Sequence, residues 1–250
     1  MPDVTIVIDQ ETGTLLVEES CKPPDSLYAG LTELLGSSQN VGCARPVETL
    51  PVRNRSEQEL AGIPYVRVSG YYHNSLIEGP GRRTSVLFNG CDLACKGCWV
   101  PQLHSAADGS LIDVDSLADL LLDPRYKRDG VSILGGEPFL QPDGLLALVQ
   151  ALRTRNCPHI LVYTGHTYEG LLLRAIWEPA IGVILDEIDA LIDGPYVEGL
   201  TANAGSWTGS RNQRVIDMRS TRRAHRVVTA SREPASSAKR NAICHEEDDN

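Results

Sequence analysis

The chain has 250 residues, of which 42% are hydrophobic and 22% are charged, so it is long enough to form one or two globular domains. Its 33 acidic and 23 basic side chains give a net charge of −10, which argues against bulk binding of nucleic acid because such proteins usually carry a basic surplus. No apolar stretch approaches the roughly 20 residues that span a bilayer. Because no export signal opens the sequence either, we expect a cytoplasmic protein that binds no membrane.

The two ends of the chain differ in composition from its middle. Short apolar runs at residues 4–8 and 14–17 are typical of β-strands, and Ser26 is placed to cap a short helix that reaches Leu35. A stretch rich in Pro, Arg, Asn and Glu follows, so residues 1–60 predict a small ββα appendage plus a linker. Residues 219–250 contain few large apolar groups and predict a disordered tail.

Residues 61–218 predict an α/β domain, because strand-like apolar runs alternate with helical patterns. The expected strands are Tyr65–Val68, Ser85–Phe88, Val131–Leu134, His159–Tyr163 and Ala190–Ile192, and the expected helices are Val114–Leu122, Leu145–Arg153 and Tyr168–Trp177. Such an alternation favours a largely parallel sheet, in which the loops at the carboxyl ends of the strands form the ligand site. Two unusual strings, Cys91–Cys98 and Gly135–Pro138, follow expected strands, so we expect them to share one site.

Seven cysteines in a chain of this size are not a disulfide framework, because the number is odd and the expected compartment is reducing. Three of them, Cys91, Cys95 and Cys98, form a C-x3-C-x2-C string. Three thiolates on one loop can hold three corners of a cubane iron–sulfur cluster and leave the fourth iron open. The alternative is a structural zinc site completed by His104, although zinc ligands usually come as two separated pairs. The spacing favours the cluster and leaves the zinc site open.

The cysteine string FNGCDLACKGCW and the later string ILGGEPFLQ together resemble the radical S-adenosylmethionine (SAM) superfamily. Further strings at residues 77–91, 163–171, 192–200 and 209–217 resemble, in the same order, the anaerobic ribonucleotide reductase activating proteins, which belong to the glycyl-radical-enzyme activating enzymes. The resemblance covers about 150 residues, from 71 to 217. It implies a partial (β/α) barrel of the radical SAM type, carrying the appendage at one end and the tail at the other.

The resemblance also implies two cofactors, one [4Fe-4S] cluster and SAM. The three cysteines would hold the cluster, and reductive cleavage of SAM would give a 5′-deoxyadenosyl radical that abstracts hydrogen from the substrate. Gly135, Gly136 and Glu137 would receive the methionyl amino group, and Pro138 would stiffen that turn. Trp99 would shield the cluster or support the adenine, or would merely pack. The residues expected to bind SAM are therefore Gly135, Gly136, Glu137, Pro138, Trp99 and Thr164.

For the partner, the resemblance implies a glycyl radical enzyme such as anaerobic ribonucleotide reductase, with a flavodoxin or ferredoxin-like protein as electron donor. The family string (D/N)GPGxR, which is thought to meet the glycine loop of the partner, has Glu in place of Asp here. Candidate contact residues from this string and from the late string are Glu78, Gly79, Arg82, Ser210, Asn212 and Gln213. Two alternatives stay open: radical chemistry on another peptide, a nucleoside or a small metabolite, and a zinc-stabilised binding protein without catalysis.

Overall fold

The computed structural model describes residues 6–8, 15–17, 41–42, 56 and 59–230, and the chain divides into two compact units. One unit comprises residues 1–44 and 231–250, and the other comprises residues 45–230. In the first unit, β1 (Ile6–Ile8) pairs antiparallel with β2 (Leu15–Val17), which confirms the two expected strands. A third strand, β3 (Val41–Gly42), pairs parallel with β2 and was not expected. The helix expected after Ser26 lies outside the described residues.

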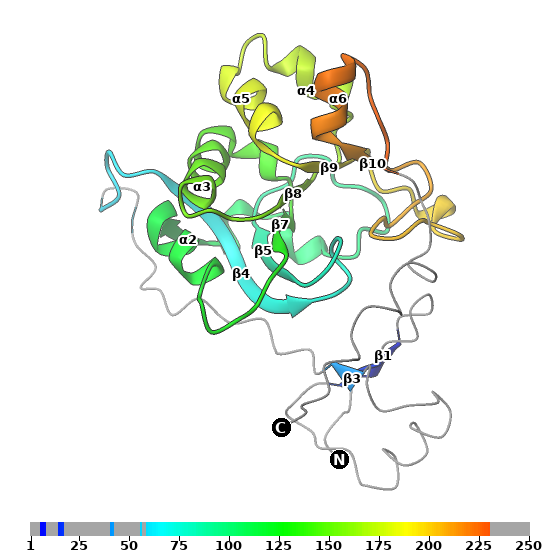
Figure 1. Cartoon of the computed structure of the whole chain (residues 1–250), viewed down its shortest axis with the longest axis horizontal. Helices are drawn as coiled ribbons and strands as arrows, with labels where there is room; N and C mark the ends of the chain where they lie inside the picture. Colours follow the sequence, from blue (N-terminus) through cyan, green and yellow to red (C-terminus); the bar gives the residue numbers. More distant parts are fainter. Residues whose placement is uncertain (1–5, 9–14, 18–40, 43–55, 57–58, 231–250) are drawn as a thin grey trace, which may run out of the picture. The chain divides into compact units, whose positions relative to one another are not determined.

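The second unit is built on a seven-stranded sheet with the strand order β10-β9-β8-β7-β5-β4-β6 (Figure 1). Its strands are β4 (Tyr65–Ser75), β5 (Arg83–Phe88), β6 (Ser110–Asp113), β7 (Gly130–Gly135), β8 (Ile160–Tyr163), β9 (Ala190–Asp193) and β10 (Arg214–Asp217). Strands β5, β7, β8 and β9 run parallel, whereas β4, β6 and β10 pair antiparallel with their neighbours. The expected α/β fold with a largely parallel sheet is therefore confirmed.

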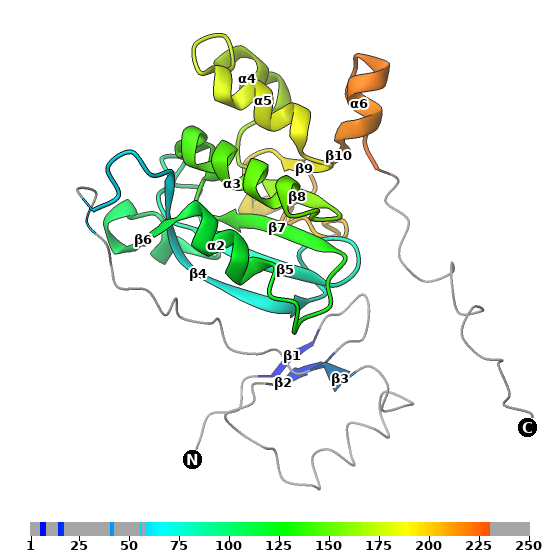
Figure 2. The same cartoon turned by 60° about the vertical axis from the view of Figure 1, so that its left-hand side comes forward.

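Helices cover one face of this sheet, as Figures 1 and 2 show from two directions. They are α2 (Val114–Leu121), α3 (Pro142–Thr154), α4 (Tyr168–Arg174), α5 (Pro179–Glu187) and α6 (Met218–Ala224). The main core lies between the helices and the sheet, where Leu148 of α3 and Ile184 of α5 are buried with Val86, Ile133 and Val162. None of the helices in the described part of the chain combines the length and apolar character needed to cross a bilayer.

The other face of the sheet is partly polar, because successive side chains of a strand point to opposite faces. The strand register places Tyr72, Ser85, Ser132 and Leu161 in one row across β4, β5, β7 and β8. Leu161 belongs to a second, smaller apolar cluster with residues of β9 and β10. This face, free of the core helices, is therefore where polar side chains can meet a ligand.

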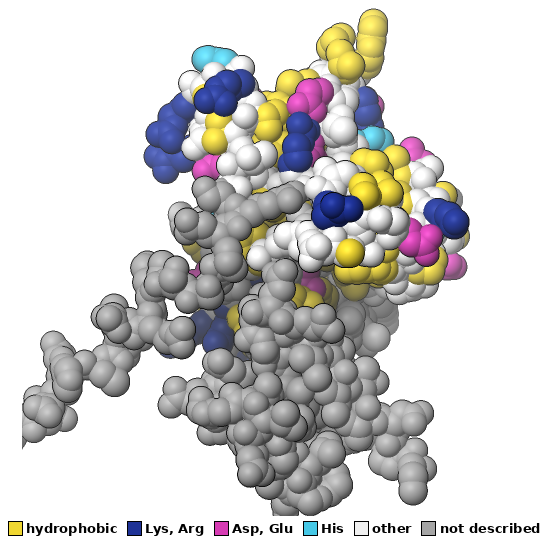
Figure 3. Space-filling view, turned by 90° about the vertical axis from the view of Figure 1, so that its right-hand side faces the viewer, with side chains coloured by type: hydrophobic (Ala, Val, Ile, Leu, Met, Phe, Trp, Pro, Cys, Tyr) yellow, Lys and Arg dark blue, Asp and Glu magenta, His cyan; other side chains and the backbone are white. Residues whose placement is uncertain are grey.

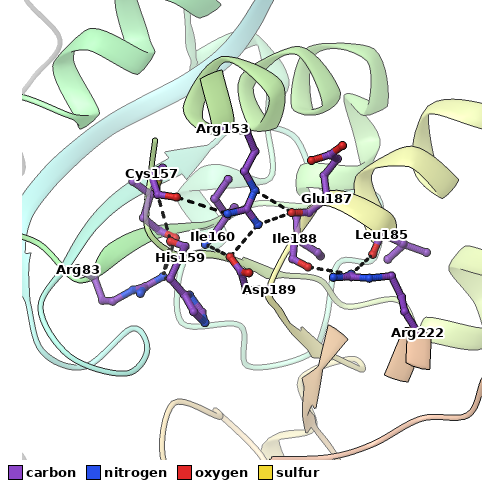
Figure 4. A network of polar contacts seen from close by, with 11 residues as sticks. Arg83, Arg153, Cys157, His159, Ile160, Leu185, Glu187, Ile188, Asp189 and Arg222 are labelled. Carbon is purple, nitrogen blue, oxygen red and sulfur yellow. Dashed lines mark hydrogen bonds and ion pairs between the residues drawn. The ribbon is translucent and has the colours of Figure 1, made fainter. Parts of the chain in front are cut away.

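A polar network fastens the amino ends of the parallel strands (Figure 4). Arg153 of α3 pairs with Asp189 at 2.7 Å, and the same Asp189 carboxylate accepts the Ile160 N–H at 2.7 Å. Arg83, which is fully buried, donates to the Val131 carbonyl at 2.7 Å. These contacts hold one end of the sheet together, so the loops at its carboxyl ends are left to form the site.

Helix α6 occupies residues for which the sequence predicted a disordered tail. The Asp217 carboxylate caps its first turn, and Arg222 donates to the backbone carbonyls of Leu185 and Ile188 (Figure 4). After the helix, the backbone pairs again with β10. The expectation that the tail starts at residue 219 is therefore wrong. Arg222 anchors α6 to carbonyl groups at the end of α5, and composition alone does not reveal such a contact. Residues 231–250 lie outside the described part of the chain.

Candidate active site

Loops from the carboxyl ends of β5 and β7 meet at two glycines. A Cβ atom on Gly136 would lie 2.3 Å from the carbonyl oxygen of Gly90, so only glycine permits this approach. The backbone N–H of Glu137 donates to the same Gly90 carbonyl at 2.7 Å. The β8 loop joins them, since a Cβ atom on Gly165 would lie 2.3 Å from Cδ1 of Leu93. The structure thus brings the cysteine string and the glycine string together at one edge of the sheet, as expected.

The three cysteines lie on the loop that follows β5, called here the cluster loop (residues 91–98). All three thiols are free and half-buried. The loop turns back on itself because Ala94 and Gly97 have φ angles of 42° and 71°, and the Cys98 N–H donates to the Cys95 carbonyl at 3.2 Å. Burial raises the pKa of the Cys91 thiol. The donor set, three thiols on one short loop, fits a cluster that leaves one iron for another ligand.

His104 lies beside the cluster loop, and the described residues do not bring its ring together with the three thiols in a metal site. The His104 carbonyl accepts the Cys91 N–H at 3.0 Å, so the two residues are neighbours through their backbones. The Nε2 atom of His104 is buried and has no hydrogen-bond partner in the described part of the chain. No group of three His, Cys, Asp or Glu side chains among the described residues has metal-binding geometry, so the thiols share a loop without converging.

Glu137 is fully buried, and its carboxylate is occupied by groups of the protein. It accepts the Phe139 N–H at 2.9 Å, the Thr164 hydroxyl at 2.9 Å and the Gly165 N–H at 2.8 Å. Burial raises its pKa, and these donors oppose the rise. Glu137 therefore ties the turn after β7, including the short helix η4 (Pro138–Leu140), to the loop after β8.

This arrangement affects the carbonyl of Gly135. The β7–β8 register pairs Ile133 with Val162, and a continued ladder would bring the Gly165 N–H to the Gly135 carbonyl. That N–H donates to Glu137 instead. The Gly165 N–H is thereby directed to Glu137 and away from the Gly135 carbonyl. A glycine carbonyl at this edge of the sheet is of the chemical type that accepts a hydrogen bond from an ammonium group such as the methionyl amino group of SAM.

The loop after β9, called here the β9 loop (residues 194–200), lies against the cluster loop. The Trp99 indole N–H donates to the Tyr196 hydroxyl at 3.0 Å, and the two ring centroids are 5.6 Å apart. A Cβ atom on Gly97 would lie 2.7 Å from Cδ of Glu198. Trp99 is 69% exposed, so this tryptophan joins the two loops at the surface rather than packing in the core.

Glu78 reaches the polar face of the sheet from the loop before β5. Oε2 of Glu78 and the hydroxyl of Ser85 are buried, and neither has a hydrogen-bond partner among the described residues. Burial raises the pKa of Glu78 to about 7, and the neighbouring Tyr72 and Ser85 hydroxyls, which lie close to the carboxyl group, oppose the rise. Burial also raises the pKa of Tyr163, which lies close enough to sense the Glu78 charge. We call Tyr72, Glu78, Ser85 and Tyr163 the polar cluster.

The two arginines after Gly79 have different surroundings. Arg82 is exposed, and its backbone N–H donates to the Asp129 carboxylate at 2.7 Å. Arg83 is buried, and its Nε donates to the Ser132 hydroxyl at 3.0 Å. Gly79 itself has a φ of 134°, and a Cβ atom there would lie 3.2 Å from Cδ1 of Leu161. Arg82 thus lies at the surface, whereas Arg83 is a structural residue.

The family model described as the 4Fe-4S single cluster domain matches residues 77–216, which is more than half of the chain. The chain belongs to this family. It is 34% identical over 150 residues to the anaerobic ribonucleoside-triphosphate reductase-activating protein of Haemophilus influenzae, covering 57% of this chain and 92% of that protein. It is 33% identical to the protein of the same name from Escherichia coli K12, covering 60% of this chain and 97% of that one.

A more distant relative is the pyruvate formate-lyase-activating enzyme of Clostridium pasteurianum, 31% identical over 41% of this chain and 44% of that enzyme. Among solved structures, QueE from Escherichia coli superposes with a TM-score of 0.37 at 17% identity, over 46% of this chain and 58% of that one, which is too slight a likeness to support a conclusion. Family membership decides between the two metal hypotheses. The protein is a radical SAM enzyme whose cofactors are one [4Fe-4S] cluster and SAM.

Sequence reasoning missed several residues that shape the site of this radical SAM enzyme. Arg214 of β10 donates to the buried Asp193 carboxylate at 2.9 Å and to Glu169 at 2.8 Å. The same Asp193 accepts the Tyr168 N–H at 2.7 Å, which fixes the start of α4. The sequence signal that could have identified Asp193 as a site residue was its position at the carboxyl end of the expected strand Ala190–Ile192. Tyr196, which binds Trp99, offered no sequence signal beyond its place in a family string.

Proposed function

We propose that this radical SAM enzyme activates a glycyl radical enzyme, such as an anaerobic ribonucleotide reductase, by removing a hydrogen atom from a glycine Cα. When bound, the cluster and SAM supply a 5′-deoxyadenosyl radical after one-electron reduction. The observation that carries the proposal is the contact between Gly136 and Gly90, which places the glycine string directly beside the thiol loop. The relatives named as reductase-activating proteins match over 92% and 97% of their own length, which supports the same activity.

Each group in the site has a role in this proposal. Cys91, Cys95 and Cys98 hold the cluster, and the Gly135 carbonyl receives the SAM ammonium group. Glu137 acts indirectly, because its carboxylate binds the Gly165 N–H that would otherwise take the Gly135 carbonyl. Pro138 and Thr164 fix the same turn, since Pro138 starts η4 and the Thr164 hydroxyl donates to Glu137.

The polar cluster is proposed to bind the peptide backbone of the substrate. The buried Glu78 carboxyl and Ser85 hydroxyl are groups that suit the N–H and C=O groups of a peptide. A glycine-bearing loop suits such a site because glycine brings no side chain and lets the backbone approach closely. Gly79 and the exposed Arg82 are close to Glu78 in the chain, where they would contact the same partner.

The electron donor is proposed to be a flavodoxin or ferredoxin-like protein, in line with the family resemblance. On the side where the β9 loop lies in Figure 1, the visible described side chains show hydrophobic groups between scattered charges of both signs (Figure 3). Nucleic acid binding favours a strongly basic surface, which the described side chains visible on this side do not form.

The proposal is tested by anaerobic reconstitution of the wild type and two cysteine variants. We expect the wild type and Cys157→Ala to bind about four iron atoms per chain and to cleave SAM under a strong reductant, because Cys157 is a buried thiol remote from the cluster loop. Cys95→Ala should lose the cluster and the activity, since only two protein ligands remain. A colourless protein with bound zinc would contradict the cofactor assignment.

The substrate is tested separately, by electron paramagnetic resonance on a candidate anaerobic reductase after incubation with the reduced enzyme and SAM. We expect a glycyl radical signal that depends on Cys95. SAM cleavage without a glycyl radical in any glycyl radical enzyme would contradict the proposed substrate and favour another peptide, a nucleoside or a small metabolite.

A further inference from the structure

We propose that the late string 209–213 is a brace that holds the β9 loop closed over the cluster loop and thereby limits access to the cluster. Ser210, Asn212 and Gln213 are then positioning residues for the metal centre rather than contacts for a partner. The inference rests on the iron–sulfur cluster that family membership assigns, and it does not depend on which substrate the enzyme activates.

Three side chains of the brace bind three backbone groups of the β9 loop. Gln213 Nε2 donates to the Gly194 carbonyl at 3.0 Å, and Asn212 Nδ2 donates to the Pro195 carbonyl at 2.7 Å. The Ser210 hydroxyl accepts the N–H of Val197 at 3.2 Å. Almost every residue in the first half of the β9 loop is therefore held by the brace.

The brace is itself fixed before it binds the loop. Gln213 Oε1 accepts the N–H groups of Gly209 at 2.7 Å and of Ser210 at 3.2 Å. The Gln213 N–H donates to the Ser210 carbonyl at 3.1 Å, and Ser210 is fully buried. The Gln213 side chain thus closes the turn with its oxygen and holds the β9 loop with its nitrogen. The brace therefore loses little conformational entropy when it binds the loop.

On its far side the β9 loop contacts Lys96 of the cluster loop and the adjoining Trp99 through exposed groups. Lys96 Nζ lies 4.0 Å from Glu198 Oε2, and the two side chains are 94% and 57% exposed. The hydrogen bond between Trp99 and Tyr196 is also at the surface. Exposed ion pairs contribute little because water screens them. These contacts are too weak to close the loop alone. Its position therefore depends on the brace and on the Gly194 N–H, which donates to the His166 carbonyl at 2.9 Å.

A loop held in this way controls how readily solvent reaches the thiols. Glu198 packs against Gly97, which lies between Cys95 and Cys98 in the chain, so opening the β9 loop removes a side chain from the segment that joins two of the three cluster ligands. Weakening the brace should therefore expose the cluster to chelators and oxygen while leaving the ligands themselves unchanged. This is the property that separates a positioning role from a ligand role.

The test uses Asn212→Ala, because Asn212 is exposed and its loss leaves the core intact. Asn212→Asp keeps the shape but removes the N–H donor, and Gln150→Ala on the exposed face of α3 is the control for losing an amide side chain. In the anaerobic holoenzyme we expect unchanged iron content and melting temperature. Iron release to a chelator should become about fivefold faster in both Asn212 variants and stay unchanged in the control, as the loss of one hydrogen bond predicts for a loop-opening equilibrium.

A second measurement follows the β9 loop directly. With Trp177 and Trp207 replaced by Phe, Trp99 is the sole tryptophan, and its emission should become easier to quench by acrylamide when Asn212→Ala is added. Unchanged iron release and unchanged quenching would overturn the inference. Faster release accompanied by a lower melting temperature would overturn it too, by showing a general structural role. Neither measurement involves a glycyl radical enzyme, so a failed activation assay leaves this test unaffected.

Discussion

The buried carboxyl group of Glu78 should make the stability of the protein depend on pH. Its pKa rises from 4.5 to about 7 in the folded state because burial disfavours the charged form, so the folded state binds the proton more tightly than the unfolded state does. The stability that this group contributes is therefore fully present below pH 4.5 and is lost as the pH rises through 7. At about 1.4 kcal/mol per pH unit, the loss between pH 5 and pH 8 is about 2–3 kcal/mol.

Glu78→Gln removes this loss, because the amide has nearly the same shape and carries no charge at any pH. The melting temperature of the wild type, measured relative to that of the variant, should be roughly 5–10 °C lower at pH 8 than at pH 5. This follows from a shift of about 2–4 °C per kcal/mol for a chain of this length. The assay is thermal unfolding of the anaerobic holoenzyme at both pH values, followed by intrinsic fluorescence.

The control for Glu78→Gln is Asp108→Asn, which removes one negative charge at an exposed position. The melting difference between this variant and the wild type should stay nearly constant with pH. The reasoning would be refuted if the difference between Glu78→Gln and the wild type were also the same at pH 5 and pH 8, because Glu78 would then be charged or solvated in the folded protein.

Two further predictions concern the loops around the site. Gly136→Ala should reduce the iron content severely, because its Cβ would lie 2.3 Å from the backbone oxygen of Gly90. The control Gly199→Ala, whose Cβ would have nothing within 4 Å, should bind iron normally. Equal iron content in the two variants would show that the backbone can shift. Asp193→Asn should lower the free energy of unfolding by about 3–5 kcal/mol, because it breaks the ion pair between Arg214 and a buried carboxylate. Glu169→Gln, which removes the exposed partner of the same Arg214, should lower it by less than about 1 kcal/mol. Thermal melting measures both losses of stability, and equal losses would contradict the difference in burial between the two carboxylates.

The sequence predicted the location of the site better than its internal contacts. Cys91–Cys98 and Gly135–Pro138 were expected together because both follow strands of a parallel sheet, and the strand ends do meet. Helix α5 and strand β10 were missed for physical reasons. The α5 stretch, PAIGVILDE, is too uniformly apolar to show a helical period, and the four residues of β10 are too few to show alternation.

Side-chain roles were harder to predict because they depend on partners far along the chain. Glu137 was expected to receive the SAM amino group, yet its carboxylate binds Thr164 and Gly165 of the next strand's loop. Ser210 likewise binds the backbone of Val197, which no local pattern indicates. A motif names residue types at a site, but which of them face the ligand is decided by tertiary hydrogen bonds.

The contact of Glu137 with Thr164 and Gly165 restricts how the protein can diverge in evolution. A carboxylate that satisfies a hydroxyl and an N–H of another loop cannot be exchanged without leaving those donors unpaired. The two segments, 27 residues apart, must therefore accept substitutions as a pair. In contrast, the exposed Lys96 and Trp99 meet the β9 loop through an ion pair with Glu198 and a hydrogen bond to Tyr196 at the surface, and losing such exposed contacts costs little. These positions can therefore change more freely than Glu137 while the enzyme keeps one cofactor site.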